Sequence, residues 1–248
     1  MMEHICITRK VTNTPTVVSL YFKWDVTVLP GQFVMVWVPD YGEVPMSLSQ
    51  TGDEKCITVK AYGDSTRKLI QTKVGDEIFL RGPYGKPFST THGNKLLIGG
   101  GSGMASLRPL IDRDATGIIA SRTFDELLFS EEFEEKKRIE VTEDGKKGIK
   151  GIVLDGIDTV NPEDYAMIYV CGPEKMLKAV YDKIKNLKVN AEFSMERSMK
   201  CGIGLCDSCS VNGFQVCTDG PVFNMKQISE MTEFGTTRLL ASGKRVKI

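Results

Sequence analysis

Four cysteines lie within 17 residues toward the end of the 248-residue chain, spaced Cys201-x4-Cys206-x2-Cys209-x7-Cys217. The x4 and x2 intervals are those of plant-type [2Fe–2S] ligation, in which a short loop wraps one edge of the cluster and a later thiolate completes the four ligands. A structural zinc site is the alternative, but it usually combines two C-x2-C knuckles, and this stretch has one. We therefore predict an iron–sulfur cluster bound by these four thiolates, with a structural zinc site as the alternative.

The composition is that of an ordinary globular chain and excludes some classes of partner. Hydrophobic residues make up 41% and charged residues 26%, so material for a core is ample. The formal net charge is zero, which gives no electrostatic case for binding nucleic acid or an anionic membrane. No apolar run approaches the roughly 20 residues of a membrane-spanning helix, and the first residues lack a signal-peptide pattern. We expect a cytoplasmic chain of up to three domains without nucleic-acid or membrane partners.

Residues 1–90 read as short β-branched or aromatic runs separated by glycine- and proline-containing turns. Strands at this spacing predict a small antiparallel barrel. One short helix is expected at 65–72. The expected strands are 5–9, 16–23, 33–38 and 56–61.

Strand and helix patterns alternate after residue 95, which favours a parallel sheet flanked by helices. An apolar strand at 96–98 runs into Gly99-Gly-Gly-Ser-Gly103, and a second at 166–170 ends at Cys171-Gly-Pro173. Ligands bind at the carboxyl ends of such strands, and a glycine turn before a helix offers amide donors to phosphate. We predict a dinucleotide site at these two turns, with a plain strand-to-helix turn as the alternative. Further elements are expected as helices at 104–111, 125–137, 174–187 and 225–234, strands at 117–120 and 138–142, and a solvated basic tail at 244–247.

Barrel, α/β unit and cysteine loop follow one another in the order found in the ferredoxin–NADP⁺ reductase superfamily, which this chain resembles. Over essentially its whole length it is most similar to the electron-transfer subunits of NAD-dependent dihydroorotate dehydrogenase. The most specific matches are Met199-Lys-Cys-Gly-Ile-Gly204 and Val216-Cys-Thr-Asp-Gly-Pro-Val-Phe223. The other matching segments are Val44-Pro-Met-Ser47, Gly63-Asp-Ser-Thr66, Gly82-Pro-Tyr-Gly85, the glycine turn, Glu143-Asp-Gly145 and Cys171-Gly-Pro173.

The resemblance implies three parts: an antiparallel FAD-binding β-barrel over residues 1–90, a Rossmann-like parallel-sheet domain for NAD over 91–190, and a [2Fe–2S] subdomain over 191–248. The residues implied for FAD are Val44, Pro45, Met46, Ser47, Thr58, Val59, Lys60, Gly63, Ser65 and Thr66. Those implied for NAD are Gly100, Gly101, Gly103, Cys171, Gly172 and Pro173. The metal ligands are the four cysteines of the loop.

The resemblance also implies a partner. A catalytic subunit with FMN would oxidise dihydroorotate, and electrons would pass through [2Fe–2S] and FAD to NAD⁺, in a heterotetramer with two copies of each subunit. No residue of this chain is implied as an acid or base. Two alternatives stay open: a related subunit of a sulfhydrogenase, sulfite reductase or transhydrogenase, and a zinc-stabilised nucleotide-binding interaction module.

The chain departs from the family at Val44, where an arginine is usual. An arginine would donate two hydrogen bonds to the FAD diphosphate. We expect the backbone amides of residues 63–66, or the side chain of Lys60 or Arg67, to compensate.

Overall fold

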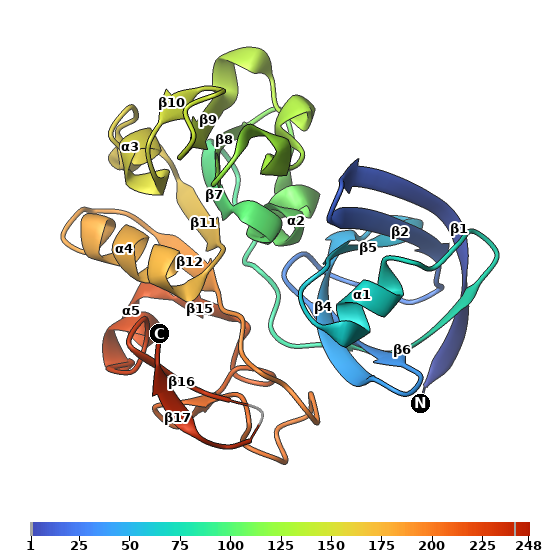
Figure 1. Cartoon of the computed structure of the whole chain (residues 1–248). Helices are drawn as coiled ribbons and strands as arrows, with labels where there is room; N and C mark the ends of the chain where they lie inside the picture. The colour runs from blue at the N-terminus through green and yellow to red at the C-terminus, as the bar shows by residue number, and fades with distance from the viewer. Residues whose placement is uncertain (1, 241) are drawn as a thin grey trace.

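The computed structural model describes residues 2–240 and 242–248, and its first part is a closed antiparallel barrel. Its strands run in the order β1-β2-β5-β4-β3-β6, and the helix α1 (Asp64–Leu69) packs beside β4 and β5 (Figure 1). Buried apolar side chains such as Leu20, Phe22 and Ile57 fill the interior, as expected for a small barrel. The strands are β1 (Glu3–Thr14), β2 (Val17–Lys23), β3 (Phe33–Val38), β4 (Gly42–Gln50), β5 (Glu54–Lys60) and β6 (Glu77–Tyr84).

The second part is a seven-stranded sheet in the order β10-β9-β8-β7-β11-β12-β15, parallel except for the antiparallel edge strand β15. The two strands that end in the glycine turn and in Cys171-Gly172 are neighbours, because β7 pairs with β11. Their carboxyl ends therefore meet at one edge of the sheet. The strands are β7 (Lys95–Gly100), β8 (Ala115–Ser121), β9 (Arg138–Thr142), β10 (Ile149–Lys150), β11 (Met167–Cys171), β12 (Ala191–Ser194) and β15 (Val222–Asn224).

The longest helix of the described chain is α4 (Glu174–Ile184), which begins directly after Gly172-Pro173. Its buried residues Leu177, Val180 and Ile184 recur at three- and four-residue intervals and form one apolar face. The shorter elements are α2 (Met104–Leu107), α3 (Val153–Ile157), α5 (Met225–Glu230), β13 (Ser210–Val211), β14 (Phe214–Gln215), β16 (Thr237–Leu239) and β17 (Arg245–Lys247). No helix in the described part of the chain has the length and apolarity needed to cross a membrane.

One expected element is wrong. Residues 125–137 form three separate 3-10 turns, at 124–126, 130–132 and 135–137, rather than a helix. Leu127, Leu128 and Phe129 are consecutive and all pack against the core, whereas a helix would turn each one about 100° from the last. The basic residues of the tail at 244–247 are exposed, as expected, and the tail is also ordered, because β17 pairs with β16 in a hairpin.

Several other bounds differ from expectation, and two barrel strands, β4 and β6, were not expected. β4 carries Gly42, Pro45 and two serines, a weak strand pattern. Pairing with β3 from Phe33↔Ser47 to Val38↔Gly42 holds it in the sheet. The helices expected at 65–72, 104–111, 174–187 and 225–234 end earlier, at residues 69, 107, 184 and 230, the second continuing as a 3-10 turn.

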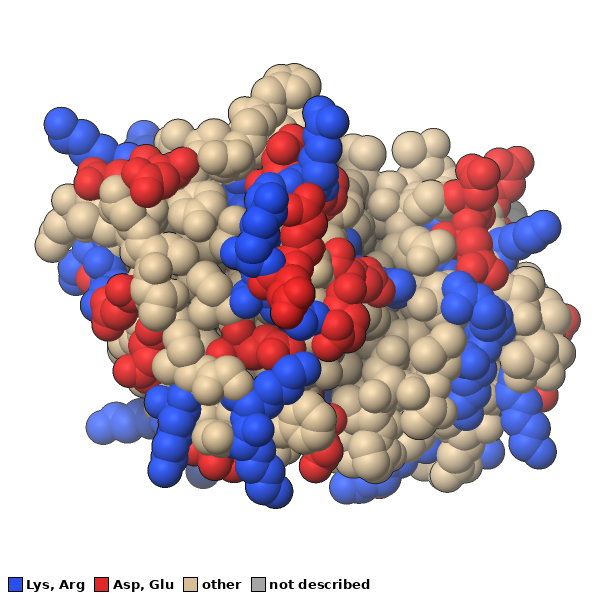
Figure 2. All heavy atoms as spheres, turned by 90° about the horizontal axis from the view of Figure 1, so that it is seen from above, with Lys and Arg blue, Asp and Glu red and all other residues tan. Residues whose placement is uncertain are grey.

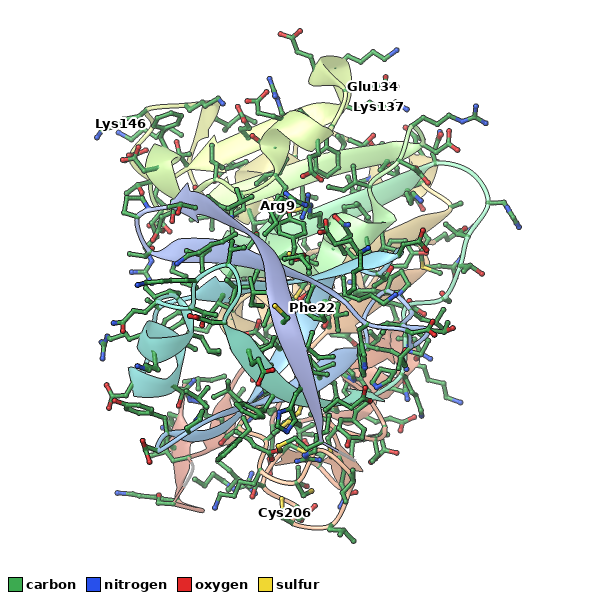
Figure 3. The ribbon with its side chains drawn as sticks, turned by 90° about the vertical axis from the view of Figure 1, so that its right-hand side faces the viewer. Arg9, Phe22, Glu134, Lys137, Lys146 and Cys206 are labelled. Atoms are coloured by element: carbon green, nitrogen blue, oxygen red, sulfur yellow. The ribbon has the colours of Figure 1, made fainter. Side chains whose placement is uncertain are left out.

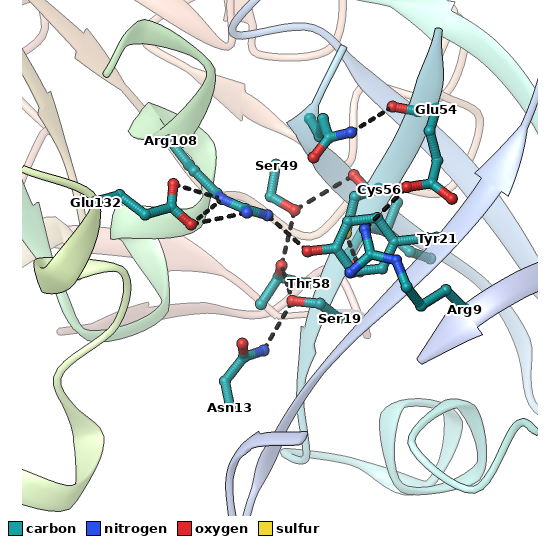
Figure 4. A network of polar contacts seen from close by, with 12 residues as sticks. Arg9, Asn13, Ser19, Tyr21, Ser49, Glu54, Cys56, Thr58, Arg108 and Glu132 are labelled. Carbon is teal, nitrogen blue, oxygen red and sulfur yellow. Dashed lines mark hydrogen bonds and ion pairs between the residues drawn. The ribbon is translucent and has the colours of Figure 1, made fainter. Parts of the chain in front are cut away.

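A polar network joins the barrel to the sheet domain (Figure 4). The Arg108 guanidinium donates to Tyr21 Oη at 3.1 Å and to the Glu132 carboxylate at 2.9 Å. Burial opposes the charge of Arg108, but hydrogen bonds to Glu132 and Tyr21 outweigh it, and the pKa of Arg108 is raised. Arg9 stacks over the Tyr21 ring at 3.4 Å from the centroid. These contacts fix the spacing between the barrel and the sheet.

Charged side chains of both signs interleave on the face seen from above, without a large patch of one sign (Figure 2). The ion pairs of the chain include Arg138–Glu131 and Lys147–Glu140. This face therefore offers no extended positive field for a polyanion.

Candidate cofactor and iron–sulfur site

A cavity of about 780 Å³ lies between the barrel and the carboxyl-end edge of the sheet. This size is within the range of small-molecule and cofactor sites. The structure brings ten of the sixteen nucleotide-site residues expected from the sequence to its wall. They are Pro45, Met46, Ser47, Thr58, Lys60 and Thr66 from the barrel side, and Gly100, Gly103, Gly172 and Pro173 from the sheet side.

The other six expected residues do not line this cavity. Val59 is fully buried in the barrel core, and Ser65 donates its hydroxyl to the carbonyl of Tyr41 at 3.0 Å. Cys171 lies beneath the cavity wall with no exposed surface. The remaining three are Val44, Gly63 and Gly101.

Buried hydroxyls hold Thr58 in place at the cavity wall (Figure 4). Its Oγ1 lies 2.7 Å from Ser49 Oγ and 2.8 Å from Ser19 Oγ, and Asn13 donates to Ser19 at 2.7 Å. Because each buried hydroxyl has a partner, the network favours one side-chain arrangement.

Of the groups expected to replace the arginine missing at position 44, Lys60 lies in the cavity wall. Its ammonium pairs with Glu126 of the sheet domain at 3.1 Å. The amide of Gly63 donates instead to Thr66 Oγ1 at 3.0 Å, and Arg67 pairs with Asp64 on the surface. Lys60 is therefore the best-placed cation on the barrel side.

The glycine turn packs directly against the end of β11. A Cβ at Gly103 would lie 2.5 Å from the carbonyl oxygen of Cys171 and 2.6 Å from the nitrogen of Gly172. Such distances are too short for a side chain, so a glycine is required for the two turns to meet. This close approach shapes the sheet side of the cavity.

We expect Gly103→Ala to lower the free energy of unfolding by about 1–3 kcal/mol, because overpacking must push the two turns apart. NAD⁺ binding should weaken with it. Urea denaturation and equilibrium dialysis with NAD⁺ would measure both. Gly52→Ala is the control, since no atom lies within 4 Å of its added Cβ. Equal midpoints for the two variants would contradict the role of Gly103.

Cys171 is a buried neutral thiol. Burial, reinforced by the nearby Glu196 carboxylate, raises its pKa to about 12, although hydrogen bonds with Ser106 and Ser194 oppose the shift. Near neutral pH it therefore supplies a small uncharged group under the cavity wall.

In the cysteine loop, backbone amides point at sulfur atoms. Gly204 N–H donates to Cys217 Sγ at 3.2 Å, Leu205 N–H to Cys201 Sγ at 3.3 Å, and Cys217 N–H to Cys209 Sγ at 3.4 Å. Amides directed at sulfur stabilise thiolate charge and tune an iron–sulfur centre. Gly204, with φ of 78°, allows the backbone to turn inward.

The four thiols lie as two pairs, Cys201 with Cys206 and Cys209 with Cys217. Among the described residues, no three Cys, His, Asp or Glu side chains converge on one metal-ion position. Burial opposes ionisation of Cys201, but the amides of Ile203, Cys206 and Leu205 outweigh it, lowering the pKa to about 6.

One edge of the loop faces solvent. Cys209 and Cys217 are buried, whereas Cys206 is exposed. Leu205 is 79% exposed and Ile203 48% exposed beside it. Figure 3 shows Cys206 at one end of the molecule, with Glu134 and Lys137 at the opposite end.

Sequence reasoning missed the segment between the cavity and the cysteines. Residues 195–199 line the cavity, and Cys201 follows two positions later. Glu196 lines the cavity with an exposed side chain, and desolvation by the surrounding protein raises its pKa. Its position just past the carboxyl end of β12 was the signal that could have identified it.

An antiparallel barrel, a parallel sheet with a glycine turn at its ligand-binding edge, and a four-thiol loop define an iron–sulfur oxidoreductase with the ferredoxin reductase fold. Residues 196–229 match the family described as "Iron-sulfur cluster binding domain of dihydroorotate dehydrogenase B". A relative from Thermoplasma volcanium is 48% identical and covers 100% of this chain and 99% of its own length. One from Archaeoglobus fulgidus is 41% identical and covers 92% and 99%. Both are named "Probable dihydroorotate dehydrogenase B (NAD(+)), electron transfer subunit".

The chain therefore belongs to the family of dihydroorotate dehydrogenase B electron transfer subunits. The family and the fold class predicted from the sequence are confirmed.

Solved structures agree with the fold. The structure titled "Insights into flavin-based electron bifurcation via the NADH-dependent reduced ferredoxin-NADP oxidoreductase structure" matches with a TM-score of 0.79 and 29% identity, over 90% of this chain and 88% of that one. The ferredoxin reductase in carbazole 1,9a-dioxygenase matches with a TM-score of 0.65 and 22% identity, over 76% and 66%. At that identity the second match supports the fold alone.

Proposed function

We propose that this chain is the electron transfer subunit of an NAD-dependent dihydroorotate dehydrogenase, carrying electrons from the FMN of a catalytic subunit through [2Fe–2S] and FAD to NAD⁺. One observation carries the proposal: the cavity wall formed by residues 195–199 runs directly into Cys201 of the cysteine loop. A two-electron site and a one-electron site are thus joined by a few residues of backbone. FAD, when bound, exchanges electrons in pairs or singly, and the cluster exchanges them singly.

The residues divide between the two nucleotides by the side of the cavity on which they lie. We assign FAD to the barrel side, where Pro45 to Ser47 come from one strand and Thr58 and Lys60 from the adjacent one. We assign NAD to the sheet side, at the glycine turn and Gly172-Pro173. The domain limits proposed are residues 1–90, 91–190 and 191–248, with β15 of the third part completing the sheet of the second.

The partner is proposed to dock at the exposed edge of the cysteine loop, where Leu205 and Ile203 present apolar side chains next to Cys206. Burying them would exclude water from the path of the electrons. The oxidation of dihydroorotate takes place in the FMN-containing subunit, so this chain supplies no acid or base to it. We propose a heterotetramer of two copies of each subunit in the cytoplasm, where the seven cysteines stay free of disulfides.

The test is co-purification with the FMN-containing catalytic subunit encoded by the same organism, followed by flavin, iron and sulfide analysis. The complex should reduce NAD⁺ with dihydroorotate, and this chain alone should not. A complex that contains FAD and cluster but does not oxidise dihydroorotate would favour the related sulfur or ferredoxin enzymes. A colourless chain holding zinc would overturn the proposal in favour of a zinc-stabilised module.

A further inference from the structure

The C-terminal hairpin of β16 and β17 forms part of the cavity wall. Arg238, Leu239, Leu240, Lys247 and Ile248 all line the cavity. The hairpin faces the start of α4 and the segment that leads to the cysteine loop, since Glu174, Lys175 and residues 195–199 line the same cavity. A segment that follows the cysteine loop in sequence thus returns to the nucleotide site.

A buried ion pair anchors this hairpin. The Arg197 guanidinium donates to Glu174 Oε1 at 2.6 Å and to the carbonyl of Thr237 at 2.9 Å. The same carboxylate oxygen accepts from the amide of Gly235 at 2.8 Å. The side chains of Arg197 and Glu174 are 2% and 9% exposed. The hairpin is therefore held in one position against α4, and the side chains on its cavity-facing side have a fixed backbone beneath them.

Charge distinguishes this wall from the rest of the cavity. Lys175, Arg238 and Lys247 line it, and none of the three forms an ion pair within the described residues. The other two cations of the cavity are neutralised, Lys60 by Glu126 and Arg197 by Glu174. Glu196 lines the same cavity and has no ion pair among the described residues, so the three cations and this carboxylate leave an excess of positive charge. Such an excess favours an anionic ligand.

The position of the hairpin indicates which anionic ligand these cations bind. The hairpin lies by the first turn of α4, directly after Gly172-Pro173 at the carboxyl end of β11. The barrel side, on the other hand, presents Lys60, whose ammonium is already paired with Glu126 of the sheet domain. We propose that the C-terminal hairpin is the outer wall of the nicotinamide-dinucleotide site, and that Arg238 and Lys247 bind the phosphates of that nucleotide. The inference rests on the proposed function, which supplies the nucleotide.

The experiment uses the full chain with its FAD and cluster bound, and measures the Kd of NAD⁺ by equilibrium dialysis. The double variant Arg238→Gln/Lys247→Gln should raise this Kd about tenfold, as the loss of two partly screened charge-assisted contacts predicts. It should also flatten the dependence of Kd on salt concentration. The FAD content should not change. Lys244→Gln is the matched control, an exposed lysine of the same hairpin that does not line the cavity.

An unchanged Kd in the double variant, or an equal rise in the Lys244→Gln control, would overturn the role of the hairpin. Loss of FAD with an unchanged Kd for NAD⁺ would assign these cations to the flavin instead and would also overturn it. These outcomes leave the proposed function intact, because the parent chain still binds both nucleotides. A parent chain that carries FAD but binds no NAD⁺ would overturn both proposals together.

Discussion

A Cys206→Ser variant is expected to purify without iron and acid-labile sulfide while it keeps its FAD. The cysteine loop would hold the cluster, and its amides are directed at the sulfur atoms of Cys201 and Cys217. Cys206 is exposed, so loss of its thiolate would open the site to solvent. The cavity wall contains none of the four cysteines. Flavin binding and cluster binding should therefore be separable.

Iron and sulfide analysis and the visible absorption spectrum would test this expectation, with FAD released by denaturation as the second readout. Cys6→Ser is the matched control, because Cys6 is also exposed but lies on β1, far from the loop in sequence. The control should retain full cluster content. An intact cluster in Cys206→Ser would refute the ligand assignment, and joint loss of cluster and FAD would refute their independence.

The cysteine loop could be predicted because its information is local. The four proposed ligands lie close in sequence, and the glycines between them permit the turns that a cluster would need. The glycine turn is similar: Gly103 is fixed by its close approach to Cys171 and Gly172. That contact is long-range, yet its two ends each follow a recognisable apolar strand. Local patterns therefore located both halves of the sheet side of the site.

The parts that sequence reasoning missed depend on contacts distant in sequence. β4 is a strand because β3 pairs with it, although its own residues favour turns. Residues 127–129 leave the helical path because each apolar side chain must reach the core. The hairpin joins the cavity because of Arg197, 40 residues from its acceptor on Thr237. No hydrophobic periodicity in the sequence predicts such a hydrogen bond.

Removing Arg197 from its buried ion pair with Glu174 gives the second large expected effect, a loss of stability. Arg197→Met should lower the free energy of unfolding by about 3–5 kcal/mol, because it leaves the Glu174 carboxylate buried without its counter-ion. Thr237 would also lose the donor to its carbonyl. Arg113→Met is the control, since the Arg113 side chain is 88% exposed, and it should change stability by less than about 0.5 kcal/mol.

The double variant Arg197→Met/Glu174→Gln should recover much of this loss, because no buried charge then remains. The pH dependence of the destabilisation provides an independent test. Burial already raises the pKa of Glu174 above its ordinary value of 4.5, and removing Arg197 should raise it further. The folded state then holds its proton more tightly than the unfolded state, so the penalty is absent below the unfolded pKa and grows as the pH rises through the folded pKa. Arg197→Met should therefore be closest to the parent chain in acid and least stable at neutral pH. Chemical denaturation across this pH range would measure it, and a destabilisation that does not change with pH would exclude Glu174 as its source.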